Sequence, residues 1–143
     1  MTNTGGPPAG LASTLTEEQW AQGFESTVLN VVRLVGLVAP GMKEQKWGRI
    51  VHITSLVAKD PEPMLTISST LRAGLSSLTR LQAKEFGPFG ITVNSLLPGH
   101  TATDRQTHLL EKRSKASGRS IEEERARSCE SIPLKRMAHP DEM

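Results

Sequence analysis

Apolar positions along the chain follow first a helical spacing, then a strand-like one, and then repeat that order. The first helical stretch begins after Thr16-Glu17-Glu18-Gln19, which has the form of a capping box, a threonine cap with a glutamine three residues on. Behind it, apolar residues recur at steps of three and four, which predicts a helix with one buried stripe that ends at Pro40-Gly41. The predicted stripe consists of Trp20, Phe24, Val28, Val31, Val32 and Val35.

Two short β-branched runs predict strands that are buried on both faces, as strands of parallel sheets are. The first extends from Gly48 to Ser55 and the second from Ile91 to Leu97. Between them, spaced leucines predict a helix from about Thr66 to Phe86, which Gly87-Pro88 ends. This order predicts an α/β unit with parallel strands. Because two strands make a poor sheet, we expect the chain to be part of a larger fold.

The whole chain reads as one incomplete domain. Residues 1–13 are rich in Gly, Pro, Ser and Thr and are expected to form a loop, residues 14–99 the core, and residues 100–143 a polar helical segment. The net charge of +2 is too small to indicate nucleic acid or an anionic membrane as a partner. A single cysteine, Cys129, and four unpaired histidines predict no metal site.

No membrane span or signal peptide is expected, so a cytoplasmic location is the default. The longest apolar stretch, from Val31 to Met42, is interrupted by Arg33, Pro40 and Gly41 and is shorter than the roughly 20 residues that a span needs. The first eight residues have neither a basic region nor an apolar core.

Several motifs occur in an order that resembles the second half of a short-chain dehydrogenase/reductase. The run from Trp47 to Ser55 resembles the fifth strand of that family, which carries a catalytic serine. Ile91 to Asn94 followed by Pro98-Gly99 resembles its sixth strand and nicotinamide-side loop. Around residue 3 the chain resembles the family's Asn-Asn-Ala-Gly motif, and its second helix resembles a branch often labelled 3-oxoacyl-acyl-carrier-protein reductases.

The resemblance implies a partial Rossmann-like, doubly wound parallel sheet that lacks the N-terminal dinucleotide-binding strands and the last strand. It implies a nicotinamide cofactor, NAD or NADP, and a small carbonyl or alcohol as substrate. The cofactor contacts that it implies are Asn3, Gly5, Arg72, Pro98, Gly99, Thr101 and Thr103. Since no strand precedes the glycines at the start of the chain, the phosphate-binding turn is missing, and we expect this chain alone to bind the cofactor weakly or not at all.

The catalytic set that the resemblance implies is incomplete. Ser55 matches the family's serine, but Ser68 stands where the tyrosine should be and Arg72 where the lysine should be. The chain contains no tyrosine at all. A serine hydroxyl is a far weaker acid than a phenol, so Ser68 cannot replace the tyrosine directly. Arg72 can hold a ribose or phosphate oxygen but cannot be deprotonated.

Two further positions depart from the family. Its asparagine on the first helix aligns with Thr27, and another asparagine position is taken by His52, which we expect to be a hydrogen-bonded core histidine. The leading hypothesis is therefore a nicotinamide-dependent oxidoreductase in truncated form. The alternatives are a non-catalytic remnant or interaction subunit, and an incomplete gene product. In each case the apolar helices 16–38 and 66–86 predict a homo-oligomer.

Overall fold

The computed structural model describes residues 1–3 and 5–142, and it divides the chain into two compact units. The first unit comprises Met1–Leu97 and the second Pro98–Met143.

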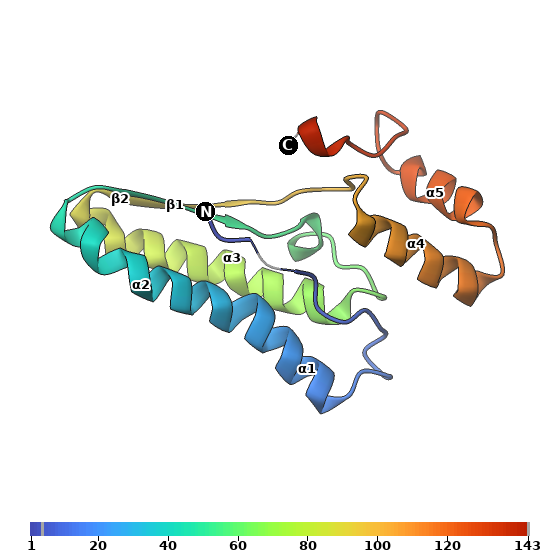
Figure 1. Ribbon diagram of the computed structural model, residues 1–143, viewed down its shortest axis with the longest axis horizontal. Helices are drawn as coiled ribbons and strands as arrows, with labels where there is room; N and C mark the ends of the chain where they lie inside the picture. Colours follow the sequence, from blue (N-terminus) through green and yellow to red (C-terminus); the bar gives the residue numbers. More distant parts are fainter. Residues whose placement is uncertain (4, 143) are drawn as a thin grey trace. The chain divides into compact units, whose positions relative to one another are not determined.

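The first unit has the predicted order of helix, strand, helix and strand (Figure 1). One long helix contains α1 (Glu17–Phe24), a π-helical turn (Glu25–Leu29) and α2 (Asn30–Glu44). It is followed by β1 (Gly48–Ile53), a short 3₁₀ turn (Leu56–Ala58) and α3 (Thr66–Phe86). A second 3₁₀ turn (Gly87–Phe89) leads into β2 (Ile91–Leu96).

The two strands are parallel and in register from Gly48↔Ile91 to Ile53↔Leu96. An isolated bridge adds Thr2 to the other edge of β1, where its backbone N–H donates to Val51 at 2.9 Å. Helices α2 and α3 pack against the same core as the strands, and the parallel pairing confirms the predicted α/β unit. The prediction that both strands are buried on two faces is wrong, because their burial alternates and Arg49, Thr92 and Asn94 are exposed. The buried members of the core are Val31, Val35, Ala39, Ile50, Leu75, Phe86, Ile91 and Val93.

The capping box at the start of α1 is confirmed. Thr16 accepts from the backbone of Gln19, whose side chain accepts from the backbone of Thr16. The predicted stripe behind it is only partly right, because Phe24 and Val32 are each 44% exposed. The buried positions are Gly23, Thr27, Val31, Val35 and Ala39. Periodicity found Val31 and Val35 but missed Gly23, Thr27 and Ala39, and the π turn in the helix changes the phase between the side chains on its two sides.

The predicted end of the first helix at Pro40-Gly41 is wrong. A proline inside a helix removes one hydrogen bond and usually breaks the helix, yet α2 continues through Pro40 to Glu44. Packing outweighs that cost, because Ala39 lies in the core and Met42 packs against it. The helix is closed further on, where the Trp47 N–H donates to the Met42 carbonyl at 3.1 Å.

Helix α3 has the predicted bounds, and a tight turn returns the chain from it to β2. Gly90 has φ +71°, and a Cβ at this residue would collide with the Lys46 carbonyl oxygen. Only glycine therefore fits this turn comfortably. The charged end of α2 is fixed nearby, since Lys43 lies 4.7 Å above the ring of Phe86.

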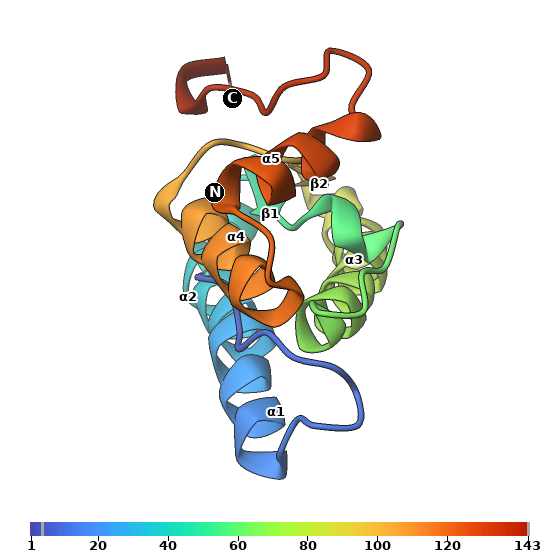
Figure 2. The same ribbon diagram turned by 90° about the vertical axis from the view of Figure 1, so that its right-hand side faces the viewer.

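The second unit is a helical hairpin of α4 (Asp104–Ser117) and α5 (Ile121–Glu130), which lie side by side in both ribbon views (Figures 1 and 2). Leu110, Cys129 and Met137 form its small core. Gly118, with φ +74°, ends α4 in the left-handed conformation.

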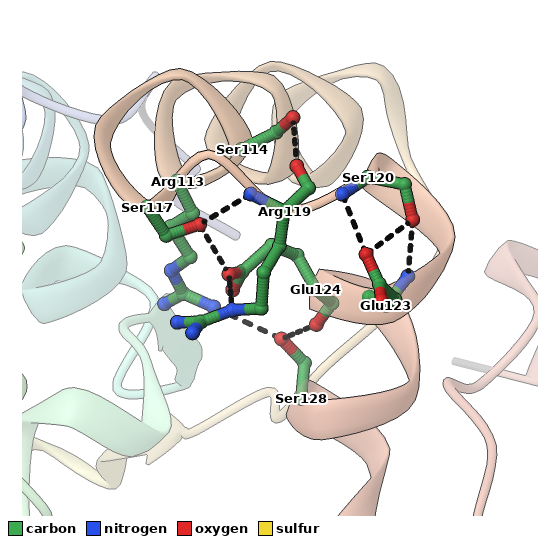
Figure 3. Close-up of polar contacts among 8 residues, drawn as sticks. All are labelled: Arg113, Ser114, Ser117, Arg119, Ser120, Glu123, Glu124 and Ser128. Atoms are coloured by element: carbon green, nitrogen blue, oxygen red, sulfur yellow. Dashed lines mark hydrogen bonds and ion pairs between the residues drawn. The ribbon is translucent and has the colours of Figure 1, made fainter.

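A buried carboxylate joins the two helices of this hairpin (Figure 3). Glu124 accepts from the Ser117 hydroxyl at 2.7 Å and from Arg119 Nε at 2.7 Å, and these bonds lower the pKa of its carboxyl group. Arg113 adds a bond across the hairpin to Ser128 at 3.0 Å. The polar sequence of this segment therefore forms an ordered network around one acidic side chain.

Candidate functional site

Ser55 lies immediately beyond the carboxyl end of β1. It is half-buried, and its side chain caps the 3₁₀ turn that follows by accepting from the Val57 N–H at 3.4 Å. Because this bond uses the oxygen as an acceptor, the hydroxyl hydrogen can still be donated. The predicted catalytic serine thus lies at the end of a parallel strand, and its hydroxyl hydrogen is available for donation.

Ser68 and Arg72 lie one helical turn apart on α3 and are bonded to each other. Arg72 Nε donates to the Ser68 hydroxyl at 3.2 Å. Both residues are buried, with Arg72 7% exposed and Ser68 8% exposed. The Nη1 group of Arg72 donates to the carbonyl of Ile53 at 3.2 Å and to that of Thr54 at 2.7 Å. The structure therefore brings both helix residues to the strand end that carries Ser55.

His52 is a fully buried core histidine, as predicted. Its Nε2 lies 2.8 Å from Gln82 Oε1, and its Nδ1 lies 2.8 Å from the Thr2 hydroxyl. Because an amide oxygen only accepts, Nε2 carries the hydrogen, and Nδ1 can accept from Thr2. This chain of bonds ties the N-terminal segment, β1 and α3 together behind Ser55.

Thr27 occupies the π turn of the first helix and is completely buried. Within residues 1–3 and 5–142, its hydroxyl oxygen has no hydrogen-bond partner. π turns inside α-helices are frequent at functional sites. The position where the resemblance implies an asparagine is therefore a distorted helical turn with a buried hydroxyl.

The N-terminal candidates Asn3 and Gly5 are both exposed. A Cβ placed on Gly5 would meet nothing within 4 Å. Asn3 directly follows Thr2, whose carbonyl accepts from the Ile53 N–H at 2.9 Å. This pairing places the N-terminal segment alongside the last residues of β1.

The remaining cofactor candidates belong to the loop that opens the second unit. Pro98 and Thr101 are partly exposed, and Gly99 and Thr103 are exposed. A bridge between Thr101 and Ala138 fixes the loop. Thr103 occupies the N-cap position of α4, but its side chain makes no capping bond, and its hydroxyl donates instead to the Thr101 carbonyl at 3.5 Å.

A pocket of about 580 Å³ within the second unit was missed by sequence reasoning. Its apolar lining includes Ala102, Ala126, Cys129 and Met137, with charged side chains such as Arg125 beside them. The helical spacing of Ala126 and Cys129 was the available signal, but the charges around them on α5 masked it. Among the residues that the structure describes, no three histidine, cysteine or acidic side chains gather as metal ligands would.

The long helix has an exposed apolar surface. Leu37 is 78% exposed and Val38 46%, and on α3 Leu81 is 61% exposed. By length and composition the helix Glu17–Glu44 could cross a membrane, with a mean hydropathy of 1.2 over its most apolar window. That match is weak support for a span, because core helices of globular proteins pass the same test and this helix supplies part of the core.

Comparisons with known proteins agree with the fold. A family model described as short chain dehydrogenase matches residues 1–114. The chain is 33% identical over 129 residues to a probable galactose dehydrogenase of Rhizobium meliloti, covering 90% of this chain and 47% of that protein. It is 31% identical over 116 residues to a 3-oxoacyl-acyl-carrier-protein reductase of Pseudomonas aeruginosa, covering 81% of this chain and 47% of that protein.

Solved structures show the same likeness. An actinorhodin polyketide ketoreductase with NADPH superimposes with a TM-score of 0.91 at 30% identity, over 98% of this chain and 54% of that one. An L-sorbose reductase from Gluconobacter frateurii, complexed with NADPH and L-sorbose, gives 0.86 at 27% identity, over 98% of this chain and 54% of that one. The chain thus spans about half the length of the curated relatives it matches.

Proposed function

Since the chain belongs to the short chain dehydrogenase family, we propose that it serves the interconversion of a small carbonyl compound and its alcohol with NAD or NADP. The similarity to reductases whose structures contain NADPH supports this proposal. The 3-oxoacyl-acyl-carrier-protein reductase among the relatives makes 3-oxoacyl thioesters one substrate class to test.

The observation that carries the proposal is the position of Ser55. Its hydroxyl stands at the carboxyl end of a parallel strand, where α/β sheets bind their ligands. With its oxygen accepting from Val57 and its hydrogen available, Ser55 can donate to a substrate carbonyl oxygen. A fixed donor of this kind stabilises the negative charge that develops on that oxygen during reduction.

We propose that the nicotinamide half of the cofactor is held by residues that the family resemblance implies. They are Asn3, Gly5, Pro98, Gly99, Thr101 and Thr103. A Cβ on Gly5 or Gly99 would meet nothing within 4 Å, so both glycines leave their backbone approachable. When bound, the cofactor supplies or accepts the hydride. For its adenosine half the fit is poor, because neither connection from a strand to a helix, residues 54–65 or 97–103, contains a glycine-rich turn.

The proton step is the weak part of the set. The chain has no tyrosine, and the Ser68 hydroxyl accepts from Arg72 Nε. A serine hydroxyl is also too weak an acid to protonate an alkoxide efficiently. We therefore propose that carbonyl reduction by this site is slow for want of a proton donor.

The test is steady-state reduction of small ketones and 3-oxoacyl thioesters by this chain, alone and completed with the segments of the Pseudomonas relative that lie outside the matched region. Alone, it should bind NAD(H) and NADP(H) weakly by calorimetry. Completed, it should bind the cofactor and turn over slowly, and Ser68→Tyr with Arg72→Lys should raise turnover by about 10²–10⁴-fold. In the completed protein Ser55→Ala should abolish activity, while the exposed control Ser13→Ala should not.

Rapid turnover by the unmodified, completed protein would contradict the account of the missing acid. A Ser55→Ala variant as active as its control would instead remove the proposed role of Ser55.

The second candidate is an interaction subunit that associates through its helices. The absence of tyrosine favours it, as does the exposed apolar surface of α2 and α3. For both candidate functions we propose a cytoplasmic homo-oligomer whose subunits associate through helices 16–38 and 66–86. The two candidates differ in one expectation. Only the first predicts catalysis by the protein that is completed with segments of the Pseudomonas relative.

A further inference from the structure

Arg72 is directed at the backbone of β1. Its Nη1 group donates to two successive carbonyls, those of Ile53 and Thr54, immediately before Ser55. We infer that Arg72 is a positioning residue, which fixes the end of β1 and through it Ser55, and that Ser68 in turn holds Arg72. The inference rests on the proposed role of Ser55, but its geometry can be tested without any activity.

The ladder between β1 and β2 explains why the Thr54 carbonyl needs a donor from a side chain. The Thr54 N–H donates to the Leu96 carbonyl at 2.8 Å. In a parallel ladder the Thr54 carbonyl would then accept from the backbone nitrogen two residues beyond Leu96. That residue is Pro98, which has no N–H. The proline therefore removes the ladder donor, and Arg72 supplies a replacement.

Arginine suits this task better than the lysine that the family carries at the same position. Its planar guanidinium presents several N–H groups in a fixed fork, so Nη1 reaches two carbonyls while Nε bonds Ser68. A lysine ammonium is a single point at the end of a flexible chain. Ser68 is short enough to accept from Nε one turn along the same helix. Serine and arginine at these two positions thus act as a matched pair.

The turn that holds Ser55 is anchored on both sides. Before it, Arg72 fixes the carbonyls of Ile53 and Thr54. After it, the Ala58 N–H donates to the Ser55 carbonyl at 3.1 Å, and Val57 is buried. Loss of the arginine should loosen the first anchor and leave the second to hold the turn alone. The exchange of the Ala58 amide hydrogen reports that change directly.

The experiment uses the 143-residue chain and two signals from nuclear magnetic resonance. One is the ¹³C chemical shift of the Thr54 carbonyl, and the other is the hydrogen-exchange rate of the Ala58 amide. In Arg72→Met the Thr54 signal should move to the position of a carbonyl without a donor. Exchange at Ala58 should speed up by about tenfold or more, as expected for the loss of a charge-assisted hydrogen bond. The exposed arginine of the same helix provides the matched control, Arg80→Met.

Two further variants separate positioning from a general loss of stability. Pro98→Ala returns a backbone N–H to the ladder, so Arg72→Met should speed Ala58 exchange much less in that background. Ser68→Ala, the milder change to use if Arg72→Met does not fold, should shift the Thr54 signal in the same direction by a smaller amount.

If Arg72→Met folds, an unchanged Thr54 carbonyl signal in that variant would overturn the inference. If it does not fold, an unchanged Thr54 signal in Ser68→Ala would overturn it. An effect of Arg72→Met that is equal in the unsubstituted chain and in the Pro98→Ala background would refute the link to the ladder.

Discussion

Replacement of Gln82 by leucine tests the buried bonds behind Ser55. Gln82 is 8% exposed, and its side-chain oxygen is the partner of His52 Nε2 at 2.8 Å. Leucine removes this acceptor and leaves the imidazole N–H unpaired at a site that water does not reach. Stranding a buried donor costs about 1–3 kcal/mol. At a urea m-value of about 1–2 kcal/mol/M, the unfolding midpoint should fall by about 0.5–3 M.

The assay is urea unfolding followed by circular dichroism, with Gln22→Leu as the control. Gln22 is exposed on α1, and its substitution should change the free energy of unfolding by no more than about 0.5 kcal/mol. In a His52→Leu background the same Gln82→Leu change should cost little, since apolar groups then replace both partners. Equal costs with and without His52, or a cost no greater than that of the control, would refute the reasoning.

Two other predictions concern the surface. Leu37→Glu should shift the sedimentation coefficient of the chain towards that of a monomer, because it places a charge in the exposed apolar face of α2. The control Leu134→Glu, at a residue 74% exposed in the second unit, should not change the sedimentation coefficient. A protein that is monomeric before substitution would contradict the proposed oligomer. Two bonds from Arg136, together with one from the His139 backbone N–H, lower the pKa of the Glu142 carboxyl group from 4.5 to about 2. Their stabilisation of the folded chain is therefore fully present above pH 4.5 and is lost as the pH falls towards 2. The thermal midpoint of Glu142→Gln should therefore approach that of the unsubstituted chain as the pH is lowered from 6 to 3, and a difference that stays constant over this range would show that the pair does not contribute.

Local signals in the sequence were sufficient for most of the elements. Helix α3 has its predicted bounds, and β1 and β2 lie within the two predicted runs. These elements combine a clear period with glycine at their ends. The long helix was harder, because Pro40 lies inside it and packing of Ala39 and Met42 overrides the proline. Packing between distant segments is not visible in a local window, so its effect could not be predicted.

The resemblance proposed the members of the candidate site, whose roles stay predictions, but it could not propose the bonds between them. The resemblance led to Ser55, Ser68 and Arg72, and in the first unit Arg72 bonds Ser68 and the Thr54 carbonyl, which directly precedes Ser55. That Arg72 bonds backbone carbonyls depends on the register of two strands and on a proline that follows one of them. Gln82 was also missed, because its hydrogen-bond partner His52 lies 30 residues away in the sequence and a local pattern does not show this contact.

The π turn at Glu25–Leu29 sets the rotational phase between the two halves of the long helix. Buried positions from Gly23 to Ala39 recur at intervals of four residues, and in a regular helix each such step drifts by about 40°. Four steps would turn Ala39 about 160° away from Gly23, and the extra residue of the π turn cancels about 100° of that. Gly23 can then face α3 so closely that a Cβ on it would lie 2.5 Å from Ile67. Removal of one residue from this turn would leave a helix of nearly the same length but rotate α1 by about 100°, and would carry Gly23 off its contact.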